Sequence, residues 1–416
     1  MKQLLKQIWN ERRANSWLWI ELLIVFVVLW YVVDWSYTTA LTYYEPMGFD
    51  ITDTYKIALT NKTTKATSYI NADDTDQTNG QDLLELVERL RRLPEVEAVA
   101  LSNNSVPYSG SNSGAGWRID STVVWPQRRL VTPDFFRVFR YQSVDGRGYE
   151  PLVEAMKRGE AIASANLLKH TRIADRPLQN STFYNVDDST KTYRVGAVAQ
   201  KVRYNDFFPN YGDLFVSWEM TEANIAQMKD ASWLELSVRV HPGTPADFPS
   251  RLMEMSDAQF SVGNLFISKV ESFKDNRRNM LTTSVNTVKT RMWMMGFLLL
   301  NIFLGIIGTF WFRTQQRRSE IGLHLALGCT RKGLRNRLMN EGILLLVLAS
   351  VPAMVICVNL GVMEAVSVWP QEFTAVRFIV GTLVTLLLMA GMIVLGIWYP
   401  AQQAMKTEPA EALRSE

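Results

Sequence analysis

Four long apolar runs constrain this 416-residue chain more than any other feature of its sequence. Each run has about the length that a helix needs to cross roughly 30 Å of hydrocarbon. We predict four membrane spans, at residues 16–33, 293–312, 342–360 and 378–399. A cleaved signal peptide is the alternative for the first run, but that run is long, is rich in Trp at both ends and is followed by no small-residue cleavage pattern. We therefore expect an α-helical, multi-pass membrane protein.

The charges between the spans predict which way the chain crosses the membrane. The loop of residues 313–341 is strongly basic, whereas the loop of residues 361–377 carries acidic residues and a single base. Short loops that are rich in Lys and Arg stay in the cytoplasm. We therefore expect residues 1–15, the basic loop and residues 400–416 to be cytoplasmic.

Residues 34–291 form the largest segment between the spans and are polar on average. Apolar periodicity predicts a strand, a helix and a strand twice, over residues 55–60, 82–93 and 96–102, and over residues 234–240, 245–255 and 264–272. Two such units indicate a split ferredoxin-like sheet. Between them, residues 131–216 contain short strand-like runs and turn signals, so we predict a mostly β insertion. The expected fold is four membrane helices plus an α+β extracytoplasmic domain.

A predicted stalk helix, residues 271–291, leads from this domain into the second span without any Gly or Pro. Together the two would make a helix of roughly 40 residues, about 60 Å long at 1.5 Å per residue. Such a rod can carry a displacement across the membrane. A flexible tether is the alternative, but apolar residues at helical spacing favour the rod.

The sequence lacks the motifs of several functional classes. There is no GxxxxGK[ST] run, so we expect no nucleotide binding through a P-loop in this chain. His170, His241 and His324 are scattered and form no metal-binding pattern. The glycine-rich loop of residues 107–117 does not open a helix, and we interpret it as a mobile loop. With a net charge of only +3 and no basic stripe, nucleic acid is not an expected partner. We predict no enzyme active site, metal or cofactor in this chain.

The basic loop contains a short amphipathic segment that ends at Gly328, a residue suited to a left-handed C-cap. Its apolar residues are Ile321, Leu323, Leu325, Ala326 and Leu327. Apolar side chains on a small cytoplasmic helix need a surface to bury against, so we expect a protein partner. The alternative is a helix lying on membrane lipid, because Leu beside basic residues also suits that surface.

The second span carries Gly296, Gly305 and Gly308, which are candidates for close helix packing. Small residues permit such packing either within one chain or between two copies. The sequence does not distinguish these two uses.

The run from Arg317 to Leu346 resembles the FtsX-type permease signature. The matching residues are Glu320, Ile321, Gly322, Ala326, Leu327, Gly328, Glu341 and Gly342. The C-terminal run resembles the end of the same family, with Pro400, Ala401, Ala404, Pro409, Ala410, Leu413 and Arg414 matching. Between the first two spans, VTPDFFRVFR, GRGY, EAIASANLLK and YRVGAVAQ resemble the periplasmic core domain of MacB-like permeases.

This resemblance implies a permease subunit of a type VII ABC transporter in the bacterial inner membrane. Its periplasmic domain would consist of a porter part and a Sabre-like insertion. ATP and Mg would be bound by a separate cytoplasmic ABC ATPase that contacts the segment from Glu320 to Gly328. His324 and Leu325 stand where relatives usually carry basic residues, which suggests a divergent ATPase. A second permease copy or a paralogue is the other implied partner. In this family, ATP-driven closure is transmitted through the stalk to the periplasmic domain, a process called mechanotransmission.

Three functions remain open at this point. The first is efflux of a peptide, drug or lipid-linked substrate from the periplasm, for which a periplasmic adaptor and a TolC-like outer-membrane channel would be further partners. The second is extraction of lipoproteins, as in LolCDE. The third belongs to another class, a transmembrane regulator of a periplasmic hydrolase, as in FtsX itself.

Overall fold

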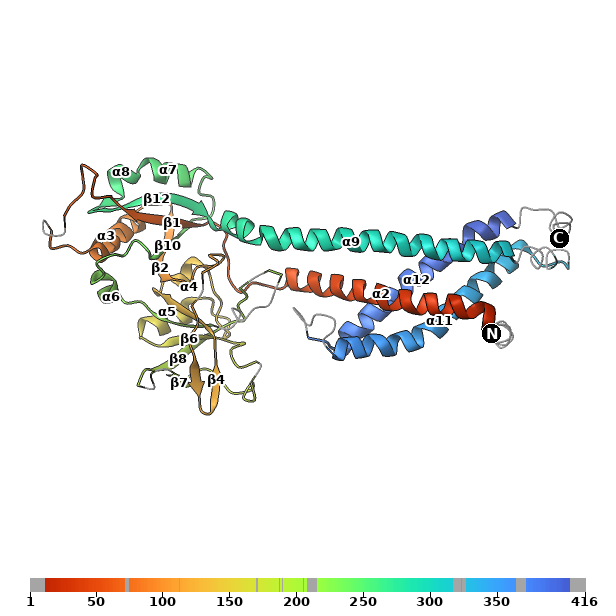
Figure 1. Ribbon diagram of the computed structural model, residues 1–416. Helices are drawn as coiled ribbons and strands as arrows, with labels where there is room; N and C mark the ends of the chain where they lie inside the picture. Colours follow the sequence, from red (N-terminus) through yellow and green to blue (C-terminus); the bar gives the residue numbers. More distant parts are fainter. Residues whose placement is uncertain are drawn as a thin grey trace. The chain divides into compact units, whose positions relative to one another are not determined.

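The computed structural model describes residues 12–71, 75–111, 113–169, 171–186, 188, 190–204, 206–207, 215–316, 323, 327–363 and 372–404. The chain divides into two compact units. The helix unit, Met1–Tyr43 and Val285–Glu416, holds the apolar helices, and the sheet unit, Tyr44–Ser284, holds the strands (Figure 1). Helix α9 contributes residues to both units.

Four helices of the described chain are long and apolar enough to cross a membrane. They are α2 (Arg12–Tyr44), α9 (Phe273–Gln316), α11 (Arg331–Val362) and α12 (Ala375–Ala404). Each contains one of the predicted spans and extends beyond it. α2 continues past residue 33 because the following residues include no Gly or Pro, and it ends shortly before Pro46, which disfavours the helical conformation in the residue before it.

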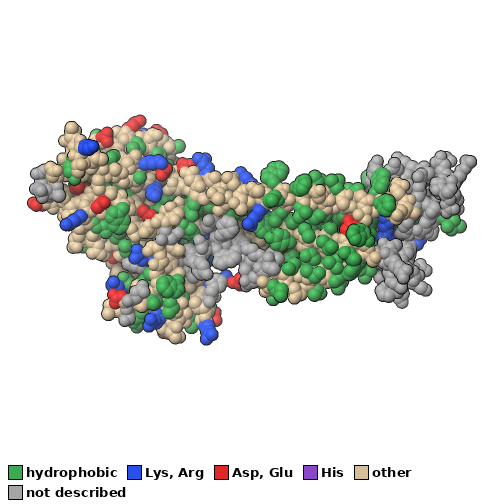
Figure 2. All heavy atoms as spheres, in the orientation of Figure 1, with side chains coloured by type: hydrophobic (Ala, Val, Ile, Leu, Met, Phe, Trp, Pro, Cys, Tyr) green, Lys and Arg blue, Asp and Glu red, His purple; other side chains and the backbone are tan. Residues whose placement is uncertain are grey.

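The membrane helices share one apolar core. On α2, Leu22, Phe26 and Leu29 recur at helical spacing and are fully buried against side chains of the other three helices. The outward faces remain hydrophobic, and Figure 2 shows such side chains covering the helices. α9 is the least enclosed of the four: 11% of its most apolar window is buried, against 28 to 33% for the other helices. Most side chains of this apolar part of α9 are therefore not covered by the other described residues.

The sheet unit is built on four antiparallel strands in the order β12-β1-β10-β2. These strands are β1 (Thr54–Asn61), β2 (Val96–Asn103), β10 (Glu235–Val240) and β12 (Leu265–Ser272). α3 (Asn79–Arg91) follows β1 and α7 (Phe248–Glu254) follows β10, which is the ferredoxin-like arrangement. α8 (Ser256–Gln259) and the short strand β11 (Ser261–Val262) complete this part. The predicted fold class is confirmed.

Alternation along β2 places a different core on each side of the sheet. Val99 and Leu101 pack with the apolar face of α3, whereas Ala98 and Ala100 face a second core that contains Phe135. Successive side chains of a strand point to opposite faces, and small alanines leave room for the large aromatic rings on the second side. At β2, the sheet is thus buried on both faces.

The segment between β2 and β10 continues the sheet outward from β2 in the order β5-β9-β6-β8-β7-β3-β4. Its elements are β3 (Trp117–Ile119), β4 (Thr122–Val124), β5 (Gln127–Val131), α4 (Phe135–Val138), α5 (Glu150–Lys157), β6 (Ala161–Ser164), β7 (Thr182–Asn185), β8 (Thr192–Ala199), β9 (Phe215–Glu219) and α6 (Glu222–Ala226). The insertion therefore begins before the predicted residue 131. β3 and β4 pair only with strands beyond the four ferredoxin-like ones, and β5 joins this outer part of the sheet to β2.

α9 begins at Phe273, directly after β12, and runs without interruption to Gln316. It starts slightly later than the predicted stalk because Glu271 and Ser272 still pair with β1. A helix of 44 residues is about 66 Å long at 1.5 Å per residue. Residues 273–316 therefore form one continuous helix.

The carboxylate of Asp82, in the first turn of α3, supplies a test of this packing. Asp82 is only 7% exposed, and burial, with a contribution from the nearby Glu85, raises its pKa from 3.8 to about 6. The folded state therefore binds this proton more tightly than the unfolded state does. The stabilising effect is complete below about pH 4 and is lost as the pH rises through about 6.

We expect Asp82→Asn to stabilise α3 by about 1–2 kcal/mol at neutral pH, because the amide keeps the shape and carries no buried charge. Hydrogen exchange of the α3 amides in the full chain, followed from about pH 4 to pH 8, measures this effect. Glu254→Gln on the exposed surface of α7 is the matched control and should change nothing. An unchanged pH dependence in Asp82→Asn would contradict the assignment.

Candidate functional site

The predicted ATPase-coupling segment lies between α9 and α11. Glu320, Ile321, Gly322, His324, Leu325 and Ala326 lie outside the described residues. Leu323 and Leu327 are 49% and 75% exposed, and the Leu327 amide donates to the Leu323 carbonyl at 3.0 Å, as in a helical turn. Gly328 has a φ of +90°, in the left-handed region that a glycine C-cap uses.

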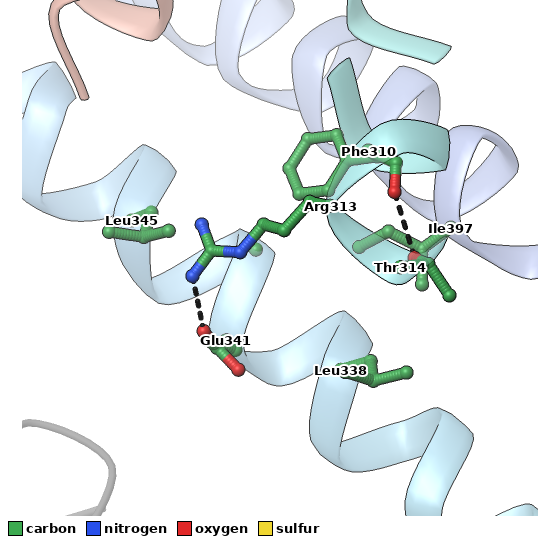
Figure 3. A pocket seen from close by; sticks show the side chains of 8 residues that line it. Phe310, Arg313, Thr314, Leu338, Glu341, Leu345 and Ile397 are labelled. Atoms are coloured by element: carbon green, nitrogen blue, oxygen red, sulfur yellow. Dashed lines mark hydrogen bonds and ion pairs between the residues drawn. The ribbon is translucent and has the colours of Figure 1, made fainter. Parts of the chain in front are cut away.

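An ion pair joins the end of α9 to the start of the apolar part of α11. Arg313 Nη2 donates to Glu341 Oε1 at 2.6 Å, and Glu341 is 3% exposed. Figure 3 shows the two side chains pointing toward each other from the two helices. A charge-assisted contact in such surroundings is stronger than the same contact in water. We call this pair the α9–α11 clamp.

A small cavity adjoins the clamp, with a volume of about 20 Å³, enough for roughly one water molecule. Its lining residues are Phe310, Arg313, Thr314, Leu338, Glu341, Gly342, Leu345 and Ile397 (Figure 3). Gly342 permits this packing, since a Cβ at that position would lie 2.8 Å from Ile393 Cγ2 and 2.9 Å from Ile397 Cδ1 of α12, and those side chains would have to shift. Three helices therefore meet at the clamp in close contact.

Two further polar contacts tie α2 to other helices of the unit. The Thr309 hydroxyl on α9 donates to the Glu21 carboxylate at 3.1 and 3.2 Å. Arg377 on α12 donates to both oxygens of Asp34, with Nε–Oδ1 and Nη2–Oδ2 distances of 2.8 and 2.5 Å. Asp34 is fully buried and Arg377 is 4% exposed. Polar groups in apolar surroundings require such partners, so these contacts specify which helices pack together.

The three glycines of the second span do not all lie on the same face of α9. A Cβ at Gly296, Gly305 or Gly308 would meet no atom within 4 Å, so none of them is used for close packing within the described chain. Gly305 and Gly308 are three residues apart and share one face of α9, whereas Gly296 is nine residues from Gly305, which is half a turn out of phase. Only the pair Gly305 and Gly308 forms one notch.

Sequence reasoning identified Glu341 as part of a motif and Arg313 as a basic residue, but it did not pair them. It also left Asp34 with Arg377, and Glu21 with Thr309, unconnected. The available signal was the position of ionisable residues inside or at the ends of apolar runs, where a polar partner is expected. No three His, Cys, Asp or Glu side chains of the described chain gather in a way that could hold a metal.

Membrane-length helices with a large α+β unit between the first two define a multi-pass membrane protein with a folded extramembrane domain. Residues 292–409 match the family model described as FtsX-like permease C-terminal. This part of the chain therefore contains an FtsX-like permease C-terminal domain, and the resemblance found from the coupling segment is confirmed. The family implies association with a cytoplasmic ABC ATPase and dimerisation.

Among solved structures, the chain is similar to the periplasmic region of MacB from Actinobacillus actinomycetemcomitans, with 10% identity, a TM-score of 0.33, and coverage of 57% of this chain and 97% of that one. It is also similar to the extracellular domain of the noncanonic ABC-type transporter YknZ from Gram-positive bacteria, with 11% identity, a TM-score of 0.32, and coverage of 51% and 100%. None of the curated proteins matches the chain.

The clamp predicts a specific stability pattern. Glu341→Ala removes the carboxylate that faces the Arg313 guanidinium, and the loss of one partner of a buried pair costs about 3 kcal/mol. The double variant Arg313→Met with Glu341→Met should recover most of this loss, because it removes both charges together. Thermal unfolding of the detergent-purified chain compares these variants, with Asn340→Ala, on the exposed side of α11, as the control. Additive losses in the double variant would show that the two residues do not act as a pair.

Proposed function

We propose that this chain is the permease subunit of a MacB-like ABC transporter, in which a separate cytoplasmic ATPase moves the sheet unit by mechanotransmission. The observation that carries the proposal is the single helix α9, which starts at the last strand of the sheet unit and ends beside the α9–α11 clamp. A helix without Gly or Pro between Phe273 and Arg291 does not bend easily, so a displacement at one end reaches the other.

In this proposal the chain lies in a bacterial inner membrane, with both termini in the cytoplasm and the sheet unit in the periplasm. The basic residues between α9 and α11 support this orientation. ATP and Mg bind to the partner ATPase, and hydrolysis drives efflux of a peptide, drug or lipid-linked substrate from the periplasm. The exposed Leu323 and Leu327 are part of the docking surface for that ATPase.

Replacing Leu323 by Asp should abolish copurification of the ATPase, because the carboxylate would have to be desolvated in an apolar interface. Asn336→Asp is the matched control, since it places the same charge at an exposed position on α11. The measurement is the amount of ATPase retained by tagged permease in mild detergent. Full retention by Leu323→Asp, with normal ATP hydrolysis, would contradict docking at this segment.

A second permease copy completes the proposed complex, since a dimeric ATPase offers two docking positions. The notch at Gly305 and Gly308, beside the exposed Leu304 and Phe312, is the proposed contact. Small residues let helix backbones approach closely in a membrane, where packing and not water exclusion drives association.

Gly308→Leu should weaken dimerisation by filling the notch, whereas Gly391→Leu should not. Gly391 on α12 also has open space around it, so it controls for the added side chain alone. Cross-linking of the chain in native membranes reports the dimer fraction. If the two variants cross-link equally, the dimer contact does not lie at the Gly305 and Gly308 notch.

Two alternatives belong to the same permease framework. An FtsX-like regulator would bind a periplasmic hydrolase and move no substrate, and a LolCDE-like machine would extract lipoproteins. Mass spectrometry of the complex purified in mild detergent distinguishes them. A periplasmic adaptor and a TolC-like channel would favour efflux, a lipoprotein would favour extraction, and a hydrolase would favour regulation.

A further inference from the structure

Five polar residues of the sheet unit meet where four separate segments of the chain come together. They are Glu45, Tyr108, Arg203, Asp206 and Arg277, and we call them the polar hub. Glu45 follows the end of α2, Arg277 lies near the start of α9, and Tyr108 belongs to the glycine-rich loop of residues 107–117. Arg203 and Asp206 come from the insertion, after β8.

Asp206 is the centre of the hub. It is 1% exposed, and its carboxylate accepts a hydrogen bond from the Tyr108 hydroxyl at 3.0 Å. The same carboxylate accepts from Arg277 Nε at 3.1 Å and also from Arg277 Nη2. One buried side chain thus links the first turns of α9 to the glycine-rich loop. Charge-assisted bonds of this kind are among the stronger contacts of a folded protein.

Arg203 extends the hub to the segment that leaves α2. It is 1% exposed, and it donates to the Glu45 carbonyl at 2.8 Å and to the Asp206 carbonyl at 3.0 Å. The Arg203 amide donates to the Met47 carbonyl at 2.9 Å. Gly48 permits this approach, because a Cβ there would overlap the Lys201 carbonyl oxygen. The insertion is therefore hydrogen-bonded both to the segment that follows α2 and to the start of α9.

Tyr108 is held in an unfavourable backbone conformation. Its φ is +59°, which is rare for a bulky residue and is retained only where the surroundings impose it. The ring is 5% exposed and packs edge-on against Phe49 at 5.8 Å. Burial and the neighbouring Asp206 raise the pKa of Tyr108, so the hydroxyl stays protonated and donates its hydrogen bond. The loop is thus tied at Tyr108, while its tip at Gly110 and Ser111 is exposed.

We propose that the polar hub couples α9 to the glycine-rich loop, with Asp206 as the positioning residue that moves Tyr108 when Arg277 moves. This inference rests on the proposed function, because it assumes that α9 is displaced by the ATPase. It assigns the loop as a moving part of the sheet unit. The hydrogen bonds to the Asp206 carboxylate transmit the displacement from α9 to the loop. As these bonds break or form, the backbone strain at Tyr108 is released or restored.

The test uses single reporter labels in the full chain, reconstituted in lipid nanodiscs. Cys329→Ser removes the exposed cysteine, and Cys357 is buried. One label is placed on the loop through Ser111→Cys and, in a separate protein, one on α9 through Lys289→Cys, both at exposed positions. In the chain alone, Arg277→Ala and Tyr108→Phe should increase the mobility of the loop label. Arg278→Ala, whose side chain is 79% exposed, should leave that mobility unchanged.

With the copurified ATPase present, ATP should change the signal of both labels. Asp206→Asn should abolish the response of the loop label and keep that of the α9 label. Tyr108→Phe removes only a hydroxyl and keeps the ring packing, so it gives the same comparison if Asp206→Asn folds poorly. An α9 response with an unaffected loop response in both variants would overturn the hub proposal. Absence of any α9 response would instead overturn the proposed mechanotransmission.

Discussion

The membrane part of this protein depends on one constraint: an ionisable side chain within apolar helices must be paired. Transfer of an isolated charge from water into such surroundings costs many kcal/mol, whereas a hydrogen-bonded pair is tolerated. Asp34 with Arg377, and Arg313 with Glu341, satisfy this requirement between different helices. Leucines pack in many arrangements, but a charge pair permits few. The pairs therefore select one set of helix neighbours from those that the apolar faces alone would allow.

The same reasoning accounts for the sheet unit, where buried polar groups lie at junctions between subdomains. Arg239 on β10 is 1% exposed and donates to the carbonyls of Val138 and Asp50, at 2.5 and 2.8 Å. It thereby joins the ferredoxin-like sheet to α4 and to the segment that enters β1. The polar hub joins the insertion to the segments beside α2 and α9. Apolar cores stabilise each part, and buried arginines fix how the parts of this unit are connected.

Sequence reasoning succeeded where the signal was local. The apolar runs, the helix predicted over residues 82–93 and found over residues 79–91, and the flanking strands follow from periodicities that a short window contains. The ion pairs could not be predicted in this way. Asp34 and Arg377 are 343 positions apart, and the local sequence around one residue does not indicate the other as its partner. The start of the insertion was missed for a similar reason: β5 looks like any short strand until its pairing with β9 is known. For the coupling segment, most residues lie outside the described part, so its role stays a prediction.

The junction between β12 and α9 has a mechanical consequence. No linker separates the strand from the helix, and Phe273, the first helical residue, is fully buried with its ring 5.0 Å from that of Phe139. Turning α9 about its own axis would force this ring out of a close-packed core, or would turn the core with it. Under the proposed mechanotransmission, a rotation of α9 would therefore also turn the packed core around Phe273. A loop of a few glycines at this point would have dissipated that twist.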